Sequence, residues 1–264
     1  MARLTLLVDG DVYAYQASAA SQHAIQWDDN VHTLDANLEE AKATFDDHIE
    51  SLKKQLEASH VVIALSDIGS GYWRRRVLPT YKMNRKATMK PLCLVPLRQY
   101  VIEKYQAKLK PMLEGDDVLG ILATHPTLIP GQKVIVSIDK DMKTIPGKFV
   151  RILDGRTEEY NITPEQADYW HMFQTLTGDT TDGYKGCPGM GPKGAEKLLQ
   201  LSKCTDMWRY VVGAFTKKGL TEADALVQAQ VARILRYTDY DFKTKLPILW
   251  NPPMKGPNVS TGNA

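Results

Sequence analysis

The chain has 264 residues and a mass of 29.6 kDa, with 43% hydrophobic and 24% charged residues, an ordinary globular composition. No run approaches the ~18 apolar residues of a membrane helix, which excludes a spanning protein, and the N-terminus lacks the pattern of a secretory signal. Three widely spaced cysteines argue against a disulfide scaffold and fit a reducing cytoplasm, and a net charge of +2 leaves the distribution of charge as the informative feature.

The N-terminal part of the chain alternates strand-like and helix-like segments. Three short apolar runs predict buried parallel strands, at Leu4–Val8, Val61–Leu65 and Val134–Ile138. Helical spacing of apolar residues predicts helices at 34–56, at 94–105 and from near Glu114. This alternation predicts an α/β fold for residues 1–160, with a mostly parallel central sheet and flanking helices.

The chain after residue 160 reads as almost wholly helical. Thr163-Pro164-Glu165-Gln166 has the pattern of a helix start, with an N-cap threonine, a proline in the first turn and a capping-box glutamine. Further helices are predicted at 192–201, 205–215 and 221–237. We therefore expect a helical region over 161–250 and a flexible tail over 251–264.

Carboxylates occur in tight groups where the predicted strands end and the helices begin, the edge where α/β sheets place their sites. They are Asp9, Asp67, Glu114, Asp116, Asp117, Asp139, Asp141, Asp179 and Asp182. Oxygen-only ligands favour hard cations such as Mg²⁺ or Mn²⁺, and so rich a cluster is typical of two ions that promote in-line attack on a phosphodiester. Any single acidic pair is as well explained by a helix cap. Asp11, in the turn after Asp9, is left open between a turn residue and a site residue.

A basic segment follows the second predicted strand. Residues 73–90 contain seven lysines and arginines and no acid, and tyrosines and a tryptophan are interleaved with them. This pattern suits a phosphate backbone and base stacking, although a solvated basic face is the simpler alternative. The candidates for nucleic-acid contact here are Arg74, Tyr81, Lys82, Arg85 and Lys86.

A glycine-rich turn at 186–195 directly follows the paired aspartates of GDTTD. Exposed backbone amides at Gly189 and Gly191, with Lys193 at the start of the next helix, predict binding to phosphates without reading base sequence. The turn is similar to the helix-hairpin-helix element of DNA repair and replication enzymes.

Six motifs in order resemble the 5′-nuclease (flap endonuclease-like, PIN-like) superfamily, and within it the short 5′→3′ exonucleases of T7-like bacteriophages. They are VDGD at 8–11, LSD at 65–67, YKMNRK at 81–86, LEGDDV at 113–118, SIDKDM at 137–142 and GDTTDGYKGCPGMGPKGA at 178–195.

The resemblance implies an α/β nuclease core that carries two divalent ions, a basic arch over about 72–95 and a helical region that holds duplex DNA. One metal cluster would use Asp9, Asp67, Glu114, Asp116 and Asp117, and the other would use Asp139, Asp141, Asp179 and Asp182. Lys82 and Arg85 match a basic pair that contacts the scissile phosphate and would stabilise transition-state charge. Tyr81 matches an aromatic residue on which a terminal base stacks, and the hairpin backbone would bind a monovalent cation, K⁺.

The implied activity is 5′→3′ exonuclease cleavage of double-stranded DNA at 5′ ends, nicks or flaps, giving 5′-phosphorylated products. It extends to flap endonuclease action and to the RNA of RNA–DNA hybrids, in phage DNA replication or recombination in the host cytoplasm, with no membrane partner and no small-molecule cofactor. Two alternatives stay open at this point. One is a structure-specific DNA-binding protein without catalysis; the other is a haloacid-dehalogenase-type phosphatase with Asp9 as nucleophile and Asp11 as general acid.

Overall fold

The computed structural model describes residues 3–253, except residues 30, 70, 88, 154 and 203–205 and the side chains of 31, 32, 86 and 87. Its centre is a five-stranded sheet in the order β4-β1-β5-β6-β7, in which β4, β1, β5 and β6 run parallel and β7 is antiparallel to β6. The strands are β1 (Leu4–Asp9), β4 (His60–Ala64), β5 (Gln132–Val136), β6 (Gly147–Leu153) and β7 (Arg156–Ile162). The three predicted strands and the mostly parallel sheet are confirmed.

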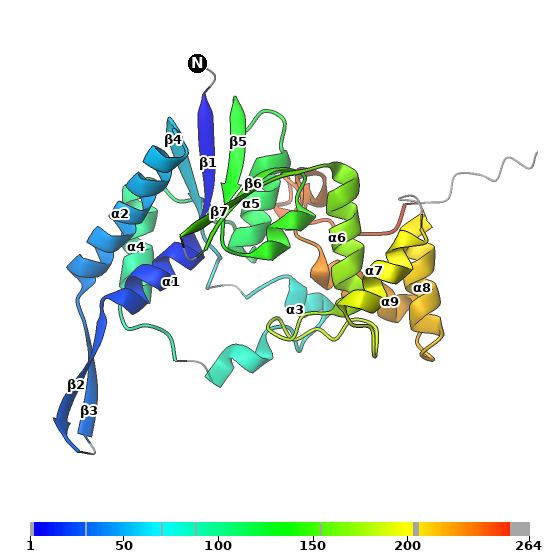
Figure 1. Cartoon of the computed structure of the whole chain (residues 1–264), viewed down its shortest axis with the longest axis horizontal. Coiled ribbons are helices and arrows are strands. Elements are labelled where there is room, and N and C mark those ends of the chain that lie inside the picture. The colour runs from blue at the N-terminus through cyan, green and yellow to red at the C-terminus, as the bar shows by residue number, and fades with distance from the viewer. Residues whose placement is uncertain are drawn as a thin grey trace, which may run out of the picture.

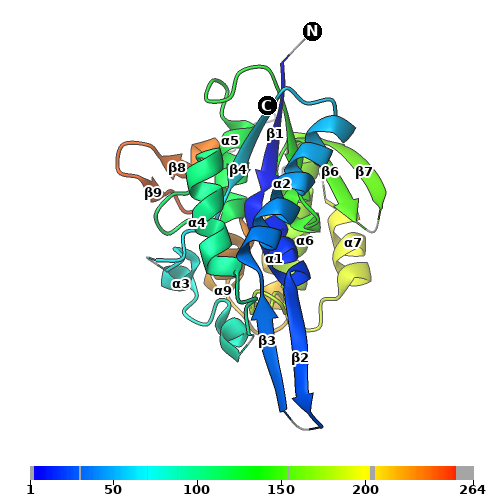
Figure 2. The same cartoon turned by 90° about the vertical axis from the view of Figure 1, so that its left-hand side faces the viewer.

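Helices cover both faces of this sheet (Figure 1, Figure 2). Successive side chains of a strand point to opposite faces, so Leu6 and Val8 pack in one core cluster and Leu7 packs in another. The first cluster is shared with α1 (Gly10–Ala20), α2 (Leu38–Gln55) and α4 (Leu94–Tyr105), and the second with α5 (Gly115–Thr124). Because both faces are buried, the strands read as continuous apolar runs in the sequence.

A β-hairpin precedes α2 and corrects the predicted helix at 34–56. Strands β2 (Gln22–Asp28) and β3 (Val31–Ala36) pair antiparallel, with Leu34 opposite Ala24, and the ribbon projects away from the sheet (Figure 1, Figure 2). The helix begins only at Leu38, because the Asn37 side chain accepts hydrogen bonds from the amides of Glu39 (2.9 Å) and Glu40 (3.3 Å). This cap ends the strand and starts the helix.

The predicted helices of the C-terminal region are present. They are α6 (Pro164–Thr177), α7 (Pro192–Gln200), α8 (Met207–Thr216) and α9 (Glu222–Ala232). The capping box is formed as expected: the amide of Gln166 donates to the Thr163 hydroxyl, and the amide of Thr163 donates to the Gln166 side chain. None of the helices in the described residues combines the length and apolar character needed to cross a bilayer.

The chain after α9 returns to the α/β core instead of continuing as the helix predicted to residue 237. A 3₁₀ turn (η4, Tyr237–Asp239) leads into the short pair β8 (Tyr240–Asp241) and β9 (Leu246–Pro247). Ile234, Leu235 and Tyr240 are buried in the same cluster as Leu119 of α5. Residues 254–264 of the predicted tail lie outside the described residues.

Candidate active site

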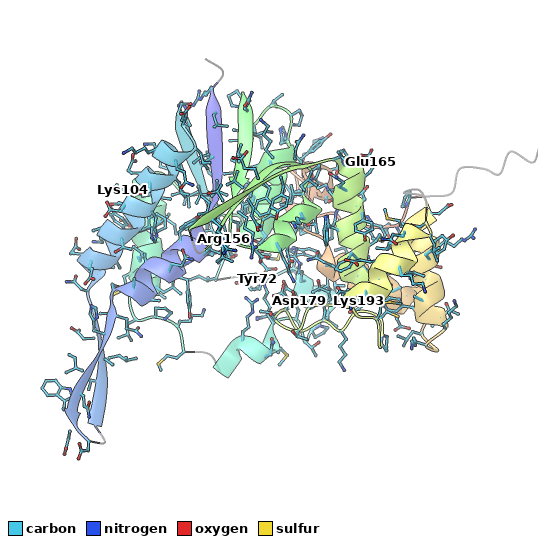
Figure 3. The ribbon with its side chains drawn as sticks, in the orientation of Figure 1. Tyr72, Lys104, Arg156, Glu165, Asp179 and Lys193 are labelled. Carbon is cyan, nitrogen blue, oxygen red and sulfur yellow. The ribbon has the colours of Figure 1, made fainter. Side chains whose placement is uncertain are left out.

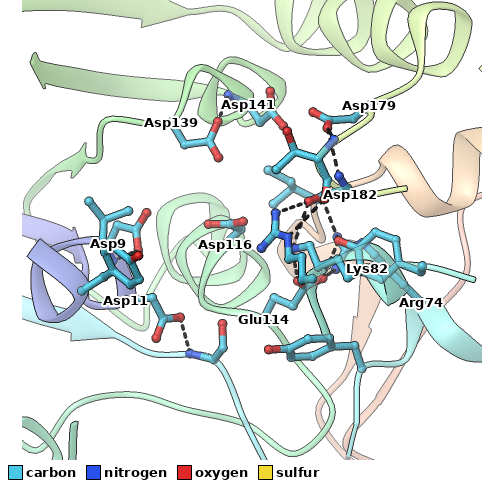
Figure 4. Close-up of a pocket in the computed structure, with 18 of the residues that line it drawn as sticks. Asp9, Asp11, Arg74, Lys82, Glu114, Asp116, Asp139, Asp141, Asp179 and Asp182 are labelled. Carbon is cyan, nitrogen blue, oxygen red and sulfur yellow. Dashed lines mark hydrogen bonds and ion pairs between the residues drawn. The ribbon is translucent and has the colours of Figure 1, made fainter. Parts of the chain in front are cut away.

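A cavity of about 880 Å³ lies at the carboxyl-terminal edge of the parallel strands and is lined by eight carboxylates (Figure 4). They are Asp9, Asp11, Glu114, Asp116, Asp139, Asp141, Asp179 and Asp182. Seven of the nine residues predicted as metal ligands therefore line one cavity; Asp67 and Asp117 do not.

The sheet brings the first of these groups together. Asp9 is the last residue of β1, which pairs with β5, and Asp139 follows β5 after two residues. The hydroxyl of Ser137 donates to Asp9 (2.7 Å) and accepts from the amide of Asp139 (3.1 Å), so one side chain links the two strand ends. Asp116 lies on the first turn of α5, and Asp141 lies on the 3₁₀ turn η2 (Lys140–Thr144).

A closed loop carries the last two aspartates. Gly178 and Gly186 both have positive φ, at 68° and 63°, and a Cβ built on either would lie 2.4 Å from backbone atoms of the opposite arm. Glycine is therefore required at both positions for the arms to approach. Inside the loop, the Asp179 carboxylate accepts from the amides of Thr181 (2.7 Å) and Asp182 (3.0 Å), which fixes the spacing of the pair.

The basic segment meets this loop at the other side of the cavity. Lys82 has a positive φ of 54°, and its amide donates to the Asp182 carbonyl (2.8 Å). The Lys82 Nζ contacts Glu114 Oε1 at 2.5 Å and Asp182 Oδ1 at 3.4 Å, and Arg85 Nη2 contacts Asp182 Oδ1 at 2.6 Å. Lys82 and Arg85, which are predicted to contact the scissile phosphate, thus both line the cavity.

Five of the cavity carboxylates form no ion pair with a described residue. Asp179 is held by the amides of its own loop, and we call the other four, Asp9, Asp116, Asp139 and Asp141, the unpaired carboxylates. Burial, with Asp139 nearby, raises the pKa of Asp9 to about 6, and burial, with Asp139 and Asp179 nearby, raises that of Asp141 to about 7. Burial and the charges of Asp9 and Asp139 raise the pKa of Asp116 well above its usual value.

These groups fit a divalent cation. Asp141 Oδ1 is buried and has no hydrogen-bond partner among the described residues. The protein therefore does not offset the cost of burying this oxygen, which a bound cation would do. Carboxylates that repel one another and lack counter-charge are the donor set that a hard divalent ion stabilises. As the side chains stand, no three acidic, histidine or cysteine residues of the described part could enclose one ion, so binding would draw the carboxylates closer together.

The opposite side of the cavity is electrostatically satisfied, and we call it the paired half. Burial alone would raise the pKa of Glu114, but Lys82 and Arg74 lower it to about 2. Arg74 Nη1 contacts Glu114 Oε2 at 2.6 Å, and its two terminal nitrogens hold both oxygens of Asp117, at 2.7 and 2.8 Å. Bidentate geometry of this kind makes a strong, fixed ion pair.

Two of the side chains predicted to contact DNA are buried in the wall of the cavity. Arg74 is 3% exposed, and besides its carboxylate partners it donates to the carbonyls of Val231 and Arg233. Tyr81 is 2% exposed, and its hydroxyl lies 2.9 Å from a carboxylate oxygen of Glu114 and 2.9 Å from one of Asp182. Its ring is therefore enclosed and offers no open face to a base. Both residues build the cavity wall.

Two predicted metal ligands are likewise engaged elsewhere. Asp117 is fully buried and, besides Arg74, accepts from the Trp73 indole (2.9 Å) and the Leu235 amide (3.1 Å). Asp67 accepts from the amides of Gly69 (3.0 Å) and Met112 (2.8 Å), which shapes the loop after β4. Their carboxylates hold the fold around the cavity.

The remaining predicted DNA contacts with described side chains do not line the cavity. Gly189 and Gly191 are exposed in the turn before α7, and Gly189 has a φ of 73°. Lys193 is exposed on the first turn of α7 and lies, like Tyr72 and Asp179, in the lower half of the molecule as drawn in Figure 3. The side chain of Lys86 falls outside the described residues.

The sequence leaves the role of one cavity residue, Asp11, undecided and gives no indication of another, Arg98. Asp11, ambiguous in the sequence, lines the cavity and forms an ion pair with Arg98 of α4. Arg98 also lines the cavity, although it belongs to none of the acidic or basic motifs of the sequence. The alternation of Asp9 and Asp11 in one turn is the only local hint of this contact.

The fold and the carboxylate-lined cavity define a nuclease of the 5′-nuclease class, and sequence comparison identifies the family. The family described as 5′-3′ exonuclease, N-terminal resolvase-like domain, matches residues 4–171, and the chain belongs to this family. It is therefore an enzyme of phosphodiester hydrolysis, and the phosphatase alternative is wrong.

Individual relatives agree with this membership. The chain is 33% identical to an exodeoxyribonuclease of Enterobacteria phage T3, over 94% of this chain and 92% of the relative. It is 34% identical to an exonuclease of Escherichia phage T7, over 94% and 93%. Its fold is similar to that of the T5 D15 protein, crystallised with metal ions, with a TM-score of 0.63 at 15% identity over 87% of this chain and 89% of that protein.

Proposed function

We propose that this protein is a divalent-metal-dependent 5′→3′ exonuclease of duplex DNA that also cuts 5′ flaps. The observation that carries the proposal is the division of one cavity into unpaired carboxylates and a paired half from which Lys82 and Arg85 project. The unpaired carboxylates suit two Mg²⁺ or Mn²⁺ ions. Lys82 and Arg85 suit the phosphate group that would lie against those ions.

The residues that would hold the ions are the cavity carboxylates other than Asp11, which pairs with Arg98. They are Asp9, Glu114, Asp116, Asp139, Asp141, Asp179 and Asp182. When bound, the ions would lower the pKa of a water and neutralise charge on the phosphate. In the hydrolysis, the water oxygen bonds to phosphorus and the bond from phosphorus to the 3′ oxygen breaks. The products carry a 5′-phosphate and a 3′-hydroxyl.

Lys82 and Arg85 act on the charge that develops on the phosphate oxygens. In the structure both contact Asp182, and Arg85 is half-exposed, so its guanidinium can turn to a substrate without leaving a buried charge unpaired. Lys82 is fixed by its backbone contact to Asp182 and by Glu114, which holds its ammonium in place and charged. A preorganised cation of this kind stabilises the transition state more than the ground state.

The duplex would be held by the exposed turn before α7, through the amides of Gly189 and Gly191 and the side chain of Lys193, with K⁺ bound to the turn carbonyls. Contacts to the backbone alone discriminate weakly between DNA and RNA strands, so the RNA of an RNA–DNA hybrid is a further substrate. The relatives from T3 and T7 support a role in phage DNA replication or recombination in the host cytoplasm.

The test uses a linear duplex labelled at the 5′ or the 3′ end, incubated with magnesium. We expect release of 5′ label as mononucleotides or short oligonucleotides, abolished by EDTA and by Asp139→Asn. Asp47→Asn is the matched control, because Asp47 is exposed on α2 and lies outside the cavity lining. It should cut at the wild-type rate.

Each other outcome contradicts part of the proposal. Release from the 3′ end would overturn the polarity. DNA binding without cleavage at any metal concentration would indicate the catalytically inert binder. Equal loss of activity in the Asp139→Asn and Asp47→Asn variants would remove the unpaired carboxylates from the mechanism.

A further inference from the structure

A buried guanidinium lies at the end of the cavity formed by α1 and α4. Arg98 is 7% exposed, lines the cavity and forms an ion pair with Asp11, and its Nη2 donates to the Ser66 carbonyl at 2.5 Å. Its Nε is buried and has no hydrogen-bond partner among the described residues. A buried guanidinium donor without a partner is costly, and in a cavity it indicates a ligand that completes it.

The Asp11 carboxylate only partly compensates this arginine. It also accepts from the Ser66 amide at 2.8 Å, so its charge is shared. Lys90 lines the same cavity, is exposed and, within the described residues, forms no ion pair. The cavity lining thus holds two cations, Arg98 and Lys90, that have only one carboxylate partner, Asp11, between them in the described part of the chain.

Arg98 lies apart from the two cations of the paired half. Figure 4 places Asp11, the partner of Arg98, on the opposite side of Asp116 from Lys82. A nucleic acid strand crossing the cavity presents a row of phosphates, of which only one can be at the scissile position. The distribution of cations on both sides of the carboxylates therefore fits two successive phosphates.

We propose that Arg98, assisted by Lys90, binds the phosphate group on the 5′ side of the scissile bond, and foremost the terminal 5′-phosphate of the substrate strand. This inference rests on the proposed nuclease function. The planar guanidinium presents several donors to one phosphate, and a terminal phosphate carries more charge than the carboxylate it would displace. Asp11 partly balances the charge of Arg98 until the phosphate arrives, and a neutral group gains too little from Arg98 to displace this carboxylate.

A purely structural role for Arg98, as a strut between α4 and the loop after β4, predicts a different result. Loss of a strut would disturb every substrate equally, whereas loss of a phosphate site would affect only substrates that carry a phosphate 5′ of the cut. The ratio of kcat/KM between such substrates separates the two roles, because effects common to all substrates cancel.

The experiment compares three duplexes labelled at the 3′ end of the cut strand. One ends in a 5′-phosphate, one ends in a 5′-hydroxyl, and one carries a short 5′ flap that ends in a hydroxyl. The first cut is resolved by length. For Arg98→Gln we expect the kcat/KM ratio of the 5′-phosphate to the 5′-hydroxyl end to fall about 10- to 100-fold, the range of a charge-assisted contact. Arg98→Lys keeps the positive charge but loses the planar set of donors, so its kcat/KM ratio should lie between those of the wild type and Arg98→Gln.

Arg233→Gln is the matched control. Arg233 is 5% exposed and pairs with Asp239 at 2.8 Å, but it does not line the cavity. Its loss should lower thermal stability and leave the substrate ratio unchanged. Should Arg98→Gln fail to fold, Lys90→Gln, on an exposed residue, should shift the ratio in the same direction by a smaller factor.

The flap arm identifies the phosphate. A fall confined to the 5′-phosphate end assigns Arg98 to the terminal phosphate, and a fall shared by the flap assigns it to the internal phosphate at the same position. Both support the site. Equal loss on all three substrates, or an unchanged ratio in both the Arg98 and the Lys90 variants, would overturn it. If the wild-type protein cuts none of the three, the proposed function itself fails.

Discussion

The two halves of the cavity contain the same kind of side chain in opposite electrostatic states. In the paired half, Glu114 lies within 2.6 Å of two cations and its pKa is held at about 2. Among the unpaired carboxylates, Asp9 and Asp141 form no ion pair with a described residue, and burial raises their pKa values to about 6 and about 7. Burial acts on all three in the same direction, so the neighbours decide the outcome.

This difference separates folding from binding. The paired half completes its charges with residues of the chain, so it contributes to a stable cavity wall before any ligand arrives. The unpaired carboxylates repel one another, and no ion pair with a described residue relieves this repulsion. A cation that binds among them therefore stabilises the folded protein more than one that binds elsewhere in the cavity. The following predictions test whether the two halves respond to change with opposite signs.

The largest expected effect is on activity. Asp116→Asn removes one charge from the unpaired carboxylates, and we expect cleavage to fall about 10²-fold or more because an ion would lose a ligand. The same change should raise stability in EDTA, because Asp9 and Asp139 would lose a repelling neighbour. Nuclease assays and urea unfolding of one preparation measure both. A variant that is both less active and less stable would contradict the assignment.

The largest expected effect on stability is in the paired half. Arg74→Leu leaves Glu114 and Asp117 buried without their guanidinium, which should cost about 3–5 kcal/mol of unfolding free energy. Urea unfolding at neutral pH measures this loss. Arg76→Leu, two residues along and exposed, is the control and should cost under about 1 kcal/mol. Similar losses in both variants would show that the buried network has no special weight.

The pH dependence of stability should also differ in sign between the halves. Asp9 and Asp141 have folded pKa values above the ordinary 3.8, so the folded protein binds the extra protons. Their contribution is complete below about pH 4 and is lost as pH rises through 6 to 7, about 3 kcal/mol for the shift of Asp9 and about 4 kcal/mol for that of Asp141. Glu114, lowered from 4.5 to about 2, contributes above about pH 4.5 and loses this as pH falls.

Unfolding in EDTA at about pH 5 and about pH 8 measures the first of these effects. We expect lower stability at the higher pH, and saturating magnesium should remove the difference by binding the folded state. Asp47→Asn should show the wild-type profile. Stability that rises between the two pH values in EDTA would mean that the carboxylates are compensated within the protein.

The smallest predicted effect is that of Tyr81→Phe. The variant loses the hydroxyl contacts to Glu114 and Asp182, which should cost about 1–2 kcal/mol. Because the ring is buried, KM for DNA should stay within about twofold of wild type once folding is complete. A large rise in KM for Tyr81→Leu at a temperature where the protein is folded would restore the stacking role.

Local patterns account for the parts of the fold that the sequence predicts well. The apolar runs at β1, β4 and β5 and the capping box of Thr163 and Gln166 each depend on residues close in the chain. The hairpin β2–β3 was missed because the apolar spacing of α2 extends backward through Leu34, and only the Asn37 cap separates the two elements.

The division of the carboxylates depends on contacts that a linear pattern does not contain. Asp117 looks like a ligand beside Asp116, yet its partner Arg74 is 43 residues away and a further donor, Leu235, is 118 residues away. Arg74 and Tyr81 belong to a basic, aromatic-rich segment that suggests a surface, and only the packing shows that they face inward. The sequence predicts which residues gather, and tertiary contacts decide which of them stay available.

The return of the chain after α9 has a consequence for biosynthesis. Arg74 donates to the carbonyls of Val231 and Arg233, and Asp117 accepts from Leu235, so the wall of the cavity is closed by a segment more than 100 residues further along the chain. On the ribosome, the N-terminal sheet emerges first. The ion pair of Arg74 with Asp117 is covered only when residues 231–235 have left the exit tunnel. A nascent chain therefore carries the carboxylates of the N-terminal sheet before the wall of the cavity around them is complete.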